Sequence, residues 1–183
     1  MDLLEREEPL RIAAGQVERA RRGQGAILLI SGEAGIGKSA LIQQLIVGVA
    51  SRQRVLQGGC EDLFSPRPLG PLRDIALEQR GALLQALDSG SAAAAFSCLH
   101  DLLNTSAVSS VVVFDDIHWA DEATLDLIKY LARRIARMPV LLLLSYRDDE
   151  VDAAHPLHQV LGDLPPKDVT RVALQALSPQ AVD

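Results

Sequence analysis

The chain has few of the residues that cross-link small secreted proteins or anchor proteins in membranes. It contains only two cysteines, Cys60 and Cys98, which lie far apart and lack the spacing of a metal-binding pair. We therefore expect free thiols in a reducing compartment. No apolar run approaches the ~18 residues that span a bilayer, and the acidic segment 1–8 lacks the apolar core of a signal peptide. These absences predict a cytoplasmic location and no membrane partner.

An excess of positive charge is also missing. The 18 basic residues are outnumbered by 24 acidic ones, which gives a formal net charge of −6. A nucleic-acid-binding surface normally needs a basic face. Arg19, Arg21 and Arg22 form one short basic cluster, but glutamates surround it in sequence, so we expect a solvated helix face there. The composition thus predicts that this chain makes no direct contact with nucleic acid.

What the sequence does contain is a phosphate-binding motif. Residues 32–39 (GEAGIGKS) fit the pattern G-x-x-x-x-G-K-S/T at every defined position. The apolar residues 26–30 precede the motif and the amphipathic residues 40–46 follow it, so it lies between a predicted strand and a predicted helix. Glycines permit loop conformations that point backbone N–H groups at phosphate oxygens. The residues that we expect to contact the nucleotide are Gly32, Glu33, Ala34, Gly35, Ile36, Gly37, Lys38, Ser39 and Ala40.

Two of these residues have specific chemical roles in such a motif. Lys38 is expected to reach the β- and γ-phosphates and to assist catalysis, and the Ser39 hydroxyl is expected to bind Mg²⁺. The sequence lacks the Asn-Lys-x-Asp tetrapeptide on which guanine selection usually depends, which favours ATP over GTP. The motif therefore predicts ATP or ADP, together with Mg²⁺, as ligands.

The alternation of strands and helices predicts one α/β domain over residues 1–183. Strands are predicted at Ala26–Ser31, 54–58, 111–114, 140–144 and, at a sheet edge, 169–174. Helices are predicted at residues 71–80, 81–88 and 92–103. A further helix is predicted near the N-terminus from the spacing of Leu10, Ala14, Val17 and Ala20. Another is predicted to begin after its cap, Asp121, to carry Leu125, Ile128, Leu131 and Ile135 on one face, and to end before Pro139. The pattern indicates a three-layer α/β fold whose mostly parallel five-stranded sheet is covered on both faces. Residues 1–25 would form an N-terminal motif and helix, and residues 26–175 the α/β core.

A second cluster of polar residues follows the predicted strand at 111–114. Asp115 and Asp116 come directly after this apolar run, at the carboxyl edge of the sheet, where ligands bind in open α/β folds. We expect Asp115 to hold Mg²⁺ opposite Ser39. Asp116 is a candidate for orienting and deprotonating the attacking water. The alternative is that Asp116 only caps the turn or pairs with a basic neighbour.

An arginine follows the neighbouring predicted strand. Arg147 comes just after residues 140–145, where its guanidinium could contact the γ-phosphate and stabilise charge during hydrolysis. The alternative is a surface ion pair with Asp148, Asp149 or Glu150. The sequence leaves both interpretations open.

Several segments resemble one family of ATPases. Residues 114–128 (FDDIHWADEATLDLI) resemble the acidic-strand signature of the AAA+-related, STAND-type domains of large LuxR-type (MalT-like) transcriptional regulators. Residues 4–10 resemble the Gly-Arg-Glu element that precedes the first helix of that family, with Glu5 in place of the glycine and with Arg6 and Glu7 matching. Residues 60–72 resemble the acidic, proline-bearing loop after the second strand, and residues 142–147 resemble the fourth strand with its sensor arginine.

The resemblance implies a regulatory ATP switch with a P-loop core whose strand order resembles 5-1-4-3-2. It implies that ATP exchange favours self-association or contact with a partner protein, and that slow hydrolysis resets the switch. It also implies a place for Arg6 near the adenine or ribose, although pairing on the helix surface is an alternative. His118 and Trp119 are expected to fix the loop and not to act in catalysis. The missing domains of such a protein would supply the self-association or partner contacts.

The last residues, 176–183, correspond to the start of the family's lid helix. We expect either an isolated core of a longer protein or a short stand-alone relative, with weak nucleotide binding and very slow turnover in the absence of the lid. A rival interpretation is a non-catalytic scaffold that holds ADP or ATP and acts through protein contacts. A phosphotransferase and a DNA-loading ATPase are less favoured, because a kinase lid usually supplies several arginines and the acidic balance opposes DNA binding. Arg133, Arg134 and Arg137 are either arginine-finger candidates or a solvated face.

Overall fold

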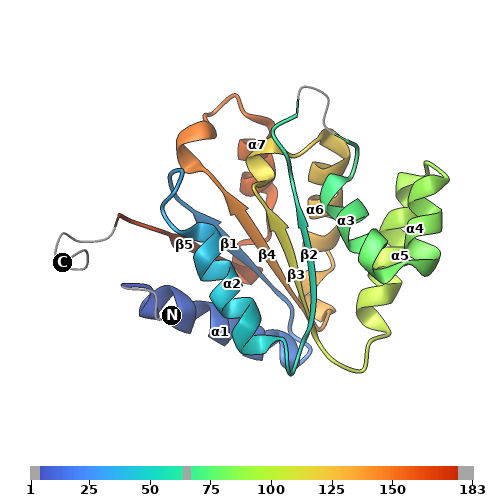
Figure 1. The fold of residues 1–183 in the computed structure, drawn as a ribbon, viewed down its shortest axis with the longest axis horizontal. Coiled ribbons are helices and arrows are strands. Elements are labelled where there is room, and N and C mark those ends of the chain that lie inside the picture. The colour runs from blue at the N-terminus through green and yellow to red at the C-terminus, as the bar shows by residue number, and fades with distance from the viewer. Residues whose placement is uncertain (1–4, 64–66, 177–183) are drawn as a thin grey trace.

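Five parallel strands form the centre of the fold (Figure 1). The computed structural model describes residues 5–63 and 67–176. Its strands are β1 (Ala26–Ser31), β2 (Arg54–Gly59), β3 (Ser110–Asp115), β4 (Val140–Tyr146) and β5 (Val169–Ala173). The strand order is β2-β3-β4-β1-β5, and every pair is parallel. The predicted α/β class, the five-stranded sheet and the order 5-1-4-3-2 are therefore confirmed.

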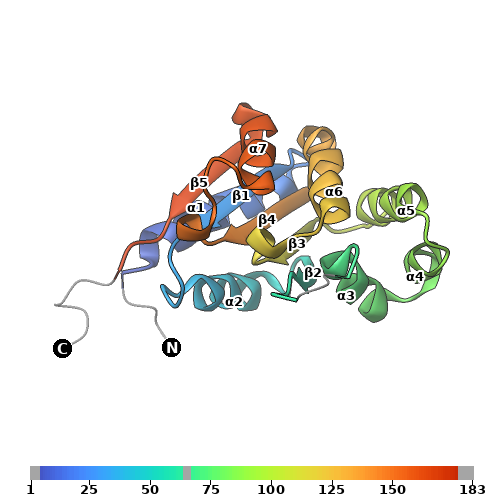
Figure 2. The ribbon, with the colours of Figure 1, turned by 90° about the horizontal axis from the view of Figure 1, so that it is seen from above.

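Helices cover both faces of the sheet (Figure 2). Along β1, Ile27 and Leu29 pack into one core with the helices that follow β2, β3 and β4, whereas Leu28 and Ile30 pack into a second core with the first two helices. Successive side chains of a strand point to opposite faces, so a strand that is covered on both faces must be apolar throughout. The helices are α1 (Glu7–Arg21), α2 (Lys38–Val49), α3 (Gly70–Gln79), α4 (Gly81–Asp88), α5 (Ala92–Asn104), α6 (Glu122–Ala132) and α7 (Pro156–Asp163).

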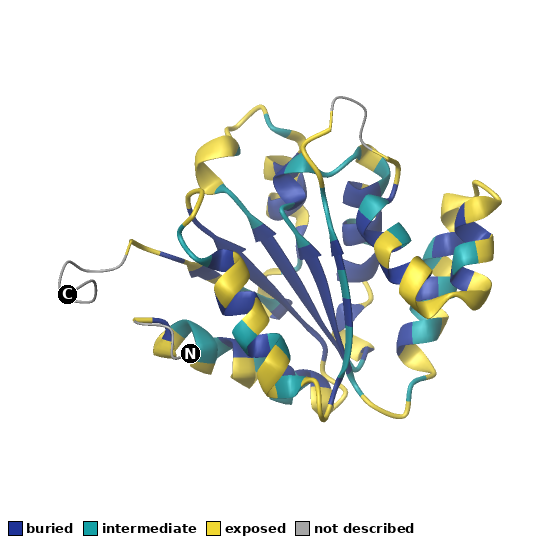
Figure 3. Ribbon diagram, in the orientation of Figure 1, coloured by how far each residue is buried: buried dark blue, intermediate teal, exposed yellow. Residues whose placement is uncertain are grey.

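Burial follows the position of each strand in the sheet (Figure 3). β1 is buried throughout, and in β3 and β4 only the last residue is partly exposed. The edge strands β2 and β5 contain partly exposed residues along their length, as the alternating sequence of residues 169–174 predicts. Among the described residues, the largest fully buried side chain is Phe114, near the carboxyl end of β3. Full burial of such a side chain contributes about 2–3 kcal/mol to folding, so the strand that carries Asp115 is firmly fixed.

One predicted helix is shorter in the structure, and another was not predicted. α6 begins after its predicted cap, Asp121, whose side chain accepts a hydrogen bond from the Ala123 N–H, but the helix ends at Ala132. Ile135 lies instead in a separate 3-10 turn (Ile135–Arg137) and is still fully buried. This turn packs closely against the chain before β1, because a Cβ on Gly25 would meet the Ile135 carbonyl oxygen at 2.1 Å. α7 was missed, although its Pro156 start and its buried Leu157, Val160 and Leu161 are helix signals.

The helix α1 is joined to the turn before β5 by an ion pair. The Arg19 guanidinium lies 2.7 Å from a carboxylate oxygen of Asp168, whose side chain is almost fully buried just before β5. Arg19 is therefore engaged in an intramolecular ion pair, so the basic cluster of Arg19, Arg21 and Arg22 is only partly a solvated helix face. Predictions for residues 1–4, 64–66 and 177–183 lie outside the described residues; these include Leu4 of the N-terminal motif, part of the proline-rich loop and most of the segment where the lid was predicted to begin.

Candidate nucleotide-binding site

The phosphate-binding motif forms the turn between β1 and α2. Gly32, Gly35 and Gly37 have φ angles of 148°, 73° and 100°, which side-chain-bearing residues rarely adopt. Gly37 precedes Lys38, the first residue of α2. The N–H groups of the first helical turn have no acceptors within a helix, so they are free to bind an anion. The strand–loop–helix context expected from the sequence is therefore present.

Lys38 is held inside this loop. Its side-chain nitrogen donates hydrogen bonds to the carbonyl oxygens of Gly32, at 2.6 Å, and Glu33, at 2.9 Å, and the residue is buried. Glu33, Ala34, Gly35, Ser39 and Ala40 are exposed around it. Phosphate oxygens would accept stronger, charge-assisted hydrogen bonds from the same ammonium group. The loop thus presents one buried cation beneath an open surface.

The two acids lie at the same edge of the sheet as the loop. Register pairs Phe114 of β3 with Leu144 of β4, and Ile30 of β1 with Ser145 of β4. The fully buried Ser145 hydroxyl donates a hydrogen bond to Asp115 Oδ1 and accepts one from the Asp116 N–H at 2.9 Å. Ser145 thereby fixes both acids. We did not predict Ser145, although a serine that ends an apolar strand beside the acidic strand was an available signal.

Replacement of Ser145 by alanine is expected to lower the free energy of unfolding by about 1–3 kcal/mol. The change leaves the partly buried Asp116 N–H without the Ser145 acceptor and removes the hydrogen bond to Asp115. Denaturant unfolding of Ser145→Ala beside Ser110→Ala provides the measurement. Ser110 is equally buried, but its hydroxyl accepts one hydrogen bond, from Arg54 Nε at 3.2 Å. Ser110→Ala should therefore lower the free energy of unfolding by less. Equal losses would contradict the role of Ser145.

Asp116 lies in a crowded electrostatic environment. Its backbone is left-handed, with φ 53° and ψ 45°. Partial burial raises the pKa of its carboxyl, and the charge of Asp115 adds to the rise, while His118, Arg147 and Lys38 oppose it. Burial lowers the pKa of His118, whose side chain is only 1% exposed. Its Nδ1 lies 3.9 Å from Asp116 Oδ1 and accepts a hydrogen bond from the Arg147 N–H at 3.4 Å. His118 thus links the segments that follow β3 and β4, as a loop-fixing residue does.

Arg147 is engaged with neighbours on its own side of the site. Its Nη1 lies 2.5 Å from Glu150 Oε1, and its guanidinium carbon lies 4.7 Å from the centre of the Trp119 ring. The ion pair that the sequence left open as an alternative is therefore formed here. The hydrogen bond to Glu150 raises the pKa of Arg147, so the side chain stays positively charged.

Arg6 contacts the loop, and not the surface of α1. The residue is 6% exposed, and its Nη2 donates to the carbonyl oxygens of Ile36 and Gln175, at 2.9 Å each. The arginines considered as finger candidates lie elsewhere, at the end of α6 and in the turn that packs against Gly25. This is the amino edge of the sheet, away from the P-loop of the same chain.

The predicted magnesium ligands suit that ion. Ser39 supplies a hydroxyl in the first turn of α2, and Asp115 supplies a carboxylate fixed by Ser145. Mg²⁺ takes oxygen ligands and is usually bound by one or two carboxylates with substrate phosphates and water, and not by an all-protein cage. Within residues 5–63 and 67–176, no group of three or more His, Cys, Asp or Glu residues forms such a cage. The donors present therefore fit a magnesium ion that arrives with a nucleotide.

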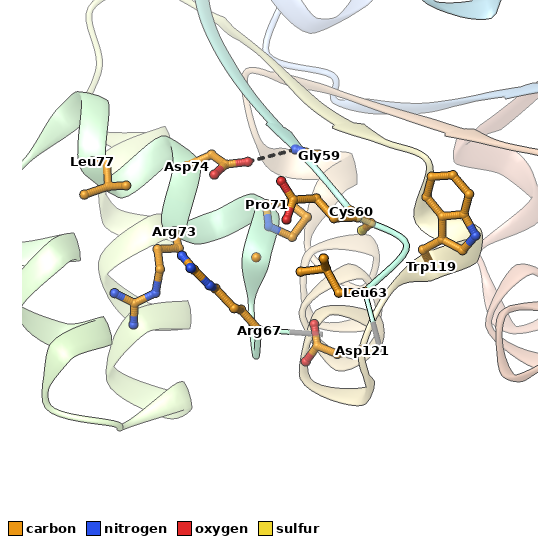
Figure 4. Close-up of a pocket in the computed structure, with 12 residues that line it drawn as sticks. Gly59, Cys60, Leu63, Arg67, Pro71, Arg73, Asp74, Leu77, Trp119 and Asp121 are labelled. Atoms are coloured by element: carbon orange, nitrogen blue, oxygen red, sulfur yellow. Dashed lines mark hydrogen bonds between the residues drawn. The ribbon is translucent and has the colours of Figure 1, made fainter. Parts of the chain in front are cut away.

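Two hollows flank the site. A small pocket of about 80 Å³ lies between the end of β2 and α3, and Figure 4 shows Cys60, Asp74, Trp119 and Asp121 around it. Burial, together with nearby aspartates, raises the pKa of the Cys60 thiol to about 12, which disfavours the reactive thiolate at neutral pH. A larger pocket, of about 580 Å³, borders the P-loop on the β5 side. It is lined by Gly32, Glu33, Ile36, Asp148, Asp149, Leu174, Gln175 and Ala176.

The fold and this loop define a P-loop nucleotide-binding domain. Residues 2–144 match the AAA ATPase domain family, and the chain belongs to that family. Membership implies nucleotide binding, and AAA+ proteins often assemble into oligomers or complexes. Within the described residues, no helix is long and apolar enough to cross a membrane.

Solved AAA+ structures share the fold at low sequence identity. Cdc6p from Pyrobaculum aerophilum is similar with a TM-score of 0.61 and 16% identity, over 93% of this chain and 45% of that one. A chain of Drosophila ORC bound to DNA has a TM-score of 0.55 and 16% identity, over 94% of this chain and 93% of that one. PCH-2 of C. elegans has a TM-score of 0.54 and 17% identity, over 97% and 45%. At these identities the likeness shows the fold alone.

A much longer bacterial protein is also similar. The uncharacterized protein R02095 of Rhizobium meliloti (strain 1021) is 28% identical over 226 residues, which include 97% of this chain but 22% of that protein. The chain therefore spans about a fifth of the length of this relative.

Proposed function

We propose that this domain binds ATP with Mg²⁺ and hydrolyses it slowly, as the nucleotide switch of a larger signalling or transcriptional regulator of the LuxR type. One observation carries the proposal: the P-loop, Asp115 and Asp116 lie at one edge of the sheet, with Ser145 between the strands that bring them there. Residues 114–128 support the regulator class by their resemblance to STAND-type domains, and the length of the Rhizobium relative agrees with it. A cytoplasmic location and self-association through further domains belong to the same proposal.

The residues divide the work by position. Lys38 and the loop N–H groups hold the phosphates, and Ser39 and Asp115 hold Mg²⁺, which would neutralise charge on the phosphate oxygens. Asp116 orients a water and accepts its proton as the water attacks the γ-phosphate, so that ADP and phosphate are released. Because the pKa of Asp116 is raised, it lies closer to the pKa of an effective base at neutral pH. For Arg147 to contact the γ-phosphate, its ion pair with Glu150 must open.

Replacement of Asp116 by asparagine is expected to slow hydrolysis by about 100-fold or more, with ATP affinity changed little. Single-turnover hydrolysis of radiolabelled ATP measures the rate, and Asp126→Asn, an exposed carboxylate on α6, is the matched control. Parental hydrolysis by Asp116→Asn would contradict the assignment of the base.

The same variant is expected to have a higher Tm. A folded-state pKa above the unfolded value means that ionised Asp116 destabilises the folded chain, fully so above the folded pKa and not at all below the unfolded one. The gain in Tm should therefore be present at pH 8 and shrink as the pH falls towards 4.

A second candidate function is a non-catalytic module that holds ADP or ATP for structure. It is favoured by the contacts of Arg147, which pairs with Glu150 and lies over the Trp119 ring and is thus not free to contact a γ-phosphate. The experiment that separates the two candidates is titration of the purified chain with ATP and ADP in Mg²⁺, followed by single-turnover hydrolysis. The switch requires binding and measurable turnover, the scaffold requires binding without turnover, and absence of binding would contradict both.

A further inference from the structure

We propose that Arg6 is a positioning residue that ties the P-loop to the chain leaving β5, so that phosphate affinity depends on the position of Leu174 and Gln175. The inference rests on the proposed nucleotide binding. It differs from a direct contact of Arg6 with the base or ribose, because here the arginine acts through the protein backbone.

The geometry is a clamp made by one nitrogen atom. Arg6 Nη2 carries two hydrogens, and it donates to the Ile36 carbonyl in the P-loop and to the Gln175 carbonyl after β5, at 2.9 Å each. The guanidinium is buried, so these hydrogen bonds have little competition from water. Its backbone is fixed as well, since the Arg6 carbonyl accepts the Leu10 N–H at the start of α1.

The segment after β5 already touches the start of the P-loop. The Leu174 N–H donates to the Ser31 carbonyl at 2.8 Å, which extends the pairing of β5 with β1. A Cβ on Gly32 would meet the Leu174 carbonyl oxygen at 3.0 Å. Leu174 and the first residue of the loop are therefore in close contact, and Arg6 adds a second connection at Ile36.

The hydrogen bond to Ile36 sets the direction of one N–H in the loop. In a planar trans peptide the C=O of one residue and the N–H of the next point in opposite directions. When Arg6 holds the Ile36 carbonyl, the Gly37 N–H must point away from Arg6, on the side where a phosphate is expected. Gly37 is free to adopt other conformations, so this peptide would rotate readily without the clamp.

The coupling is reciprocal. If phosphate binding favours the clamped peptide, then a shift of Gln175 that breaks its bond to Arg6 weakens phosphate binding, and bound phosphate stabilises the position of Gln175. A change in the chain beyond β5 would thereby reach the nucleotide site through Arg6.

The test uses the full chain and two probes, ADP and inorganic pyrophosphate, each with Mg²⁺. We expect Arg6→Ala to weaken the binding of both probes by about tenfold or more. The factor should be the same for ADP and pyrophosphate, because the defect lies in the part of the P-loop that holds the phosphates. Arg6→Lys keeps the charge but lacks the planar fork, so we expect an intermediate loss. Arg11→Ala is the matched control, since Arg11 pairs with Glu8 on the exposed face of α1. Titrations are made well below the Tm of each variant.

Three outcomes would overturn the proposal. Binding of both probes within twofold of the parent by Arg6→Ala and Arg6→Lys would show that the loop does not need the clamp. A loss restricted to ADP would indicate direct base or ribose contact. A parent chain that binds neither probe would contradict the proposed function, and with it the coupling.

Hydrogen exchange without nucleotide tests the clamp independently of binding. The Ile36 N–H donates to Glu33 and the Leu174 N–H to Ser31, so both amides report local opening. We expect both to exchange faster in Arg6→Lys and Arg6→Ala, and to be unchanged in Arg11→Ala. Unchanged exchange at both amides in the Arg6 variants would overturn the mechanical connection.

Discussion

Replacement of Lys38 by alanine is expected to weaken ATP and ADP binding by about 100-fold or more. Lys38 is the buried cation of the P-loop, and its ammonium group donates two hydrogen bonds within the loop that phosphate oxygens would take over. Alanine removes the charge and both donors together. Calorimetric titration with each nucleotide in Mg²⁺ measures the loss directly.

The control for this change is Lys129→Ala. Lys129 lies on α6, where it approaches the exposed Asp126 at 3.7 Å, so its removal alters net charge equally without touching the loop. Nucleotide affinity should stay at the parental value. If Lys38→Ala binds as tightly as the parent, the phosphate is held elsewhere and the proposed function is wrong.

The second large effect is expected in the fold. A Cβ on Gly58 would lie 2.1 Å from the Pro71 carbonyl oxygen and 2.6 Å from two further backbone atoms of Pro71. Pro71 lies in the first turn of α3, so the clash is with backbone atoms that cannot rotate away as the end of a flexible side chain could. We expect Gly58→Ala to lower the free energy of unfolding by about 3 kcal/mol or more, as measured by urea denaturation.

The next residue in the same strand provides the comparison. A Cβ on Gly59 would have no neighbour within 4 Å, so Gly59→Ala should leave stability unchanged or raise it slightly through the unfolded state. A loss of similar size in both variants would mean that general strand effects, and not the contact with Pro71, set the cost.

The sequence was sufficient to predict the parts of the fold that depend on local pattern. The apolar runs of β1, β3 and β4 had to be buried strands, and the glycines at 32, 35 and 37 had to form a turn between strand and helix. Asp115 and Asp116 followed from the same logic, because parallel strands end at one edge. Their catalytic and metal-binding roles stay predictions, as do those of Lys38, Ser39 and Arg147.

What could not be predicted depends on contacts between distant residues. Ile135 lies in a turn after α6 that closely approaches Gly25, and no local pattern reveals this contact. The hydrogen bonds of Ser145 to Asp115 and Asp116 depend on the pairing of β4 with β3, which the local sequence does not show. Two of the hydrogen bonds of the Arg6 side chain reach residues that lie 30 and 169 positions away in sequence. α7 is different, because its signals, the Pro156 start and the spacing of Leu157, Val160 and Leu161, are local.

The position of β1 in the sheet also governs when the P-loop can form. The chain pairs Ala26 with Leu141 and Ile27 with Val169, so both neighbours of β1 come late in the sequence. During synthesis the P-loop leaves the ribosome before β4 and β5, so its strand has no partner until they have followed. Pairings between such distant segments are slow to form, because a long loop must close before any contact stabilises it. The P-loop is thus made before either strand that pairs with β1, and the site it belongs to is complete only after both have joined the sheet.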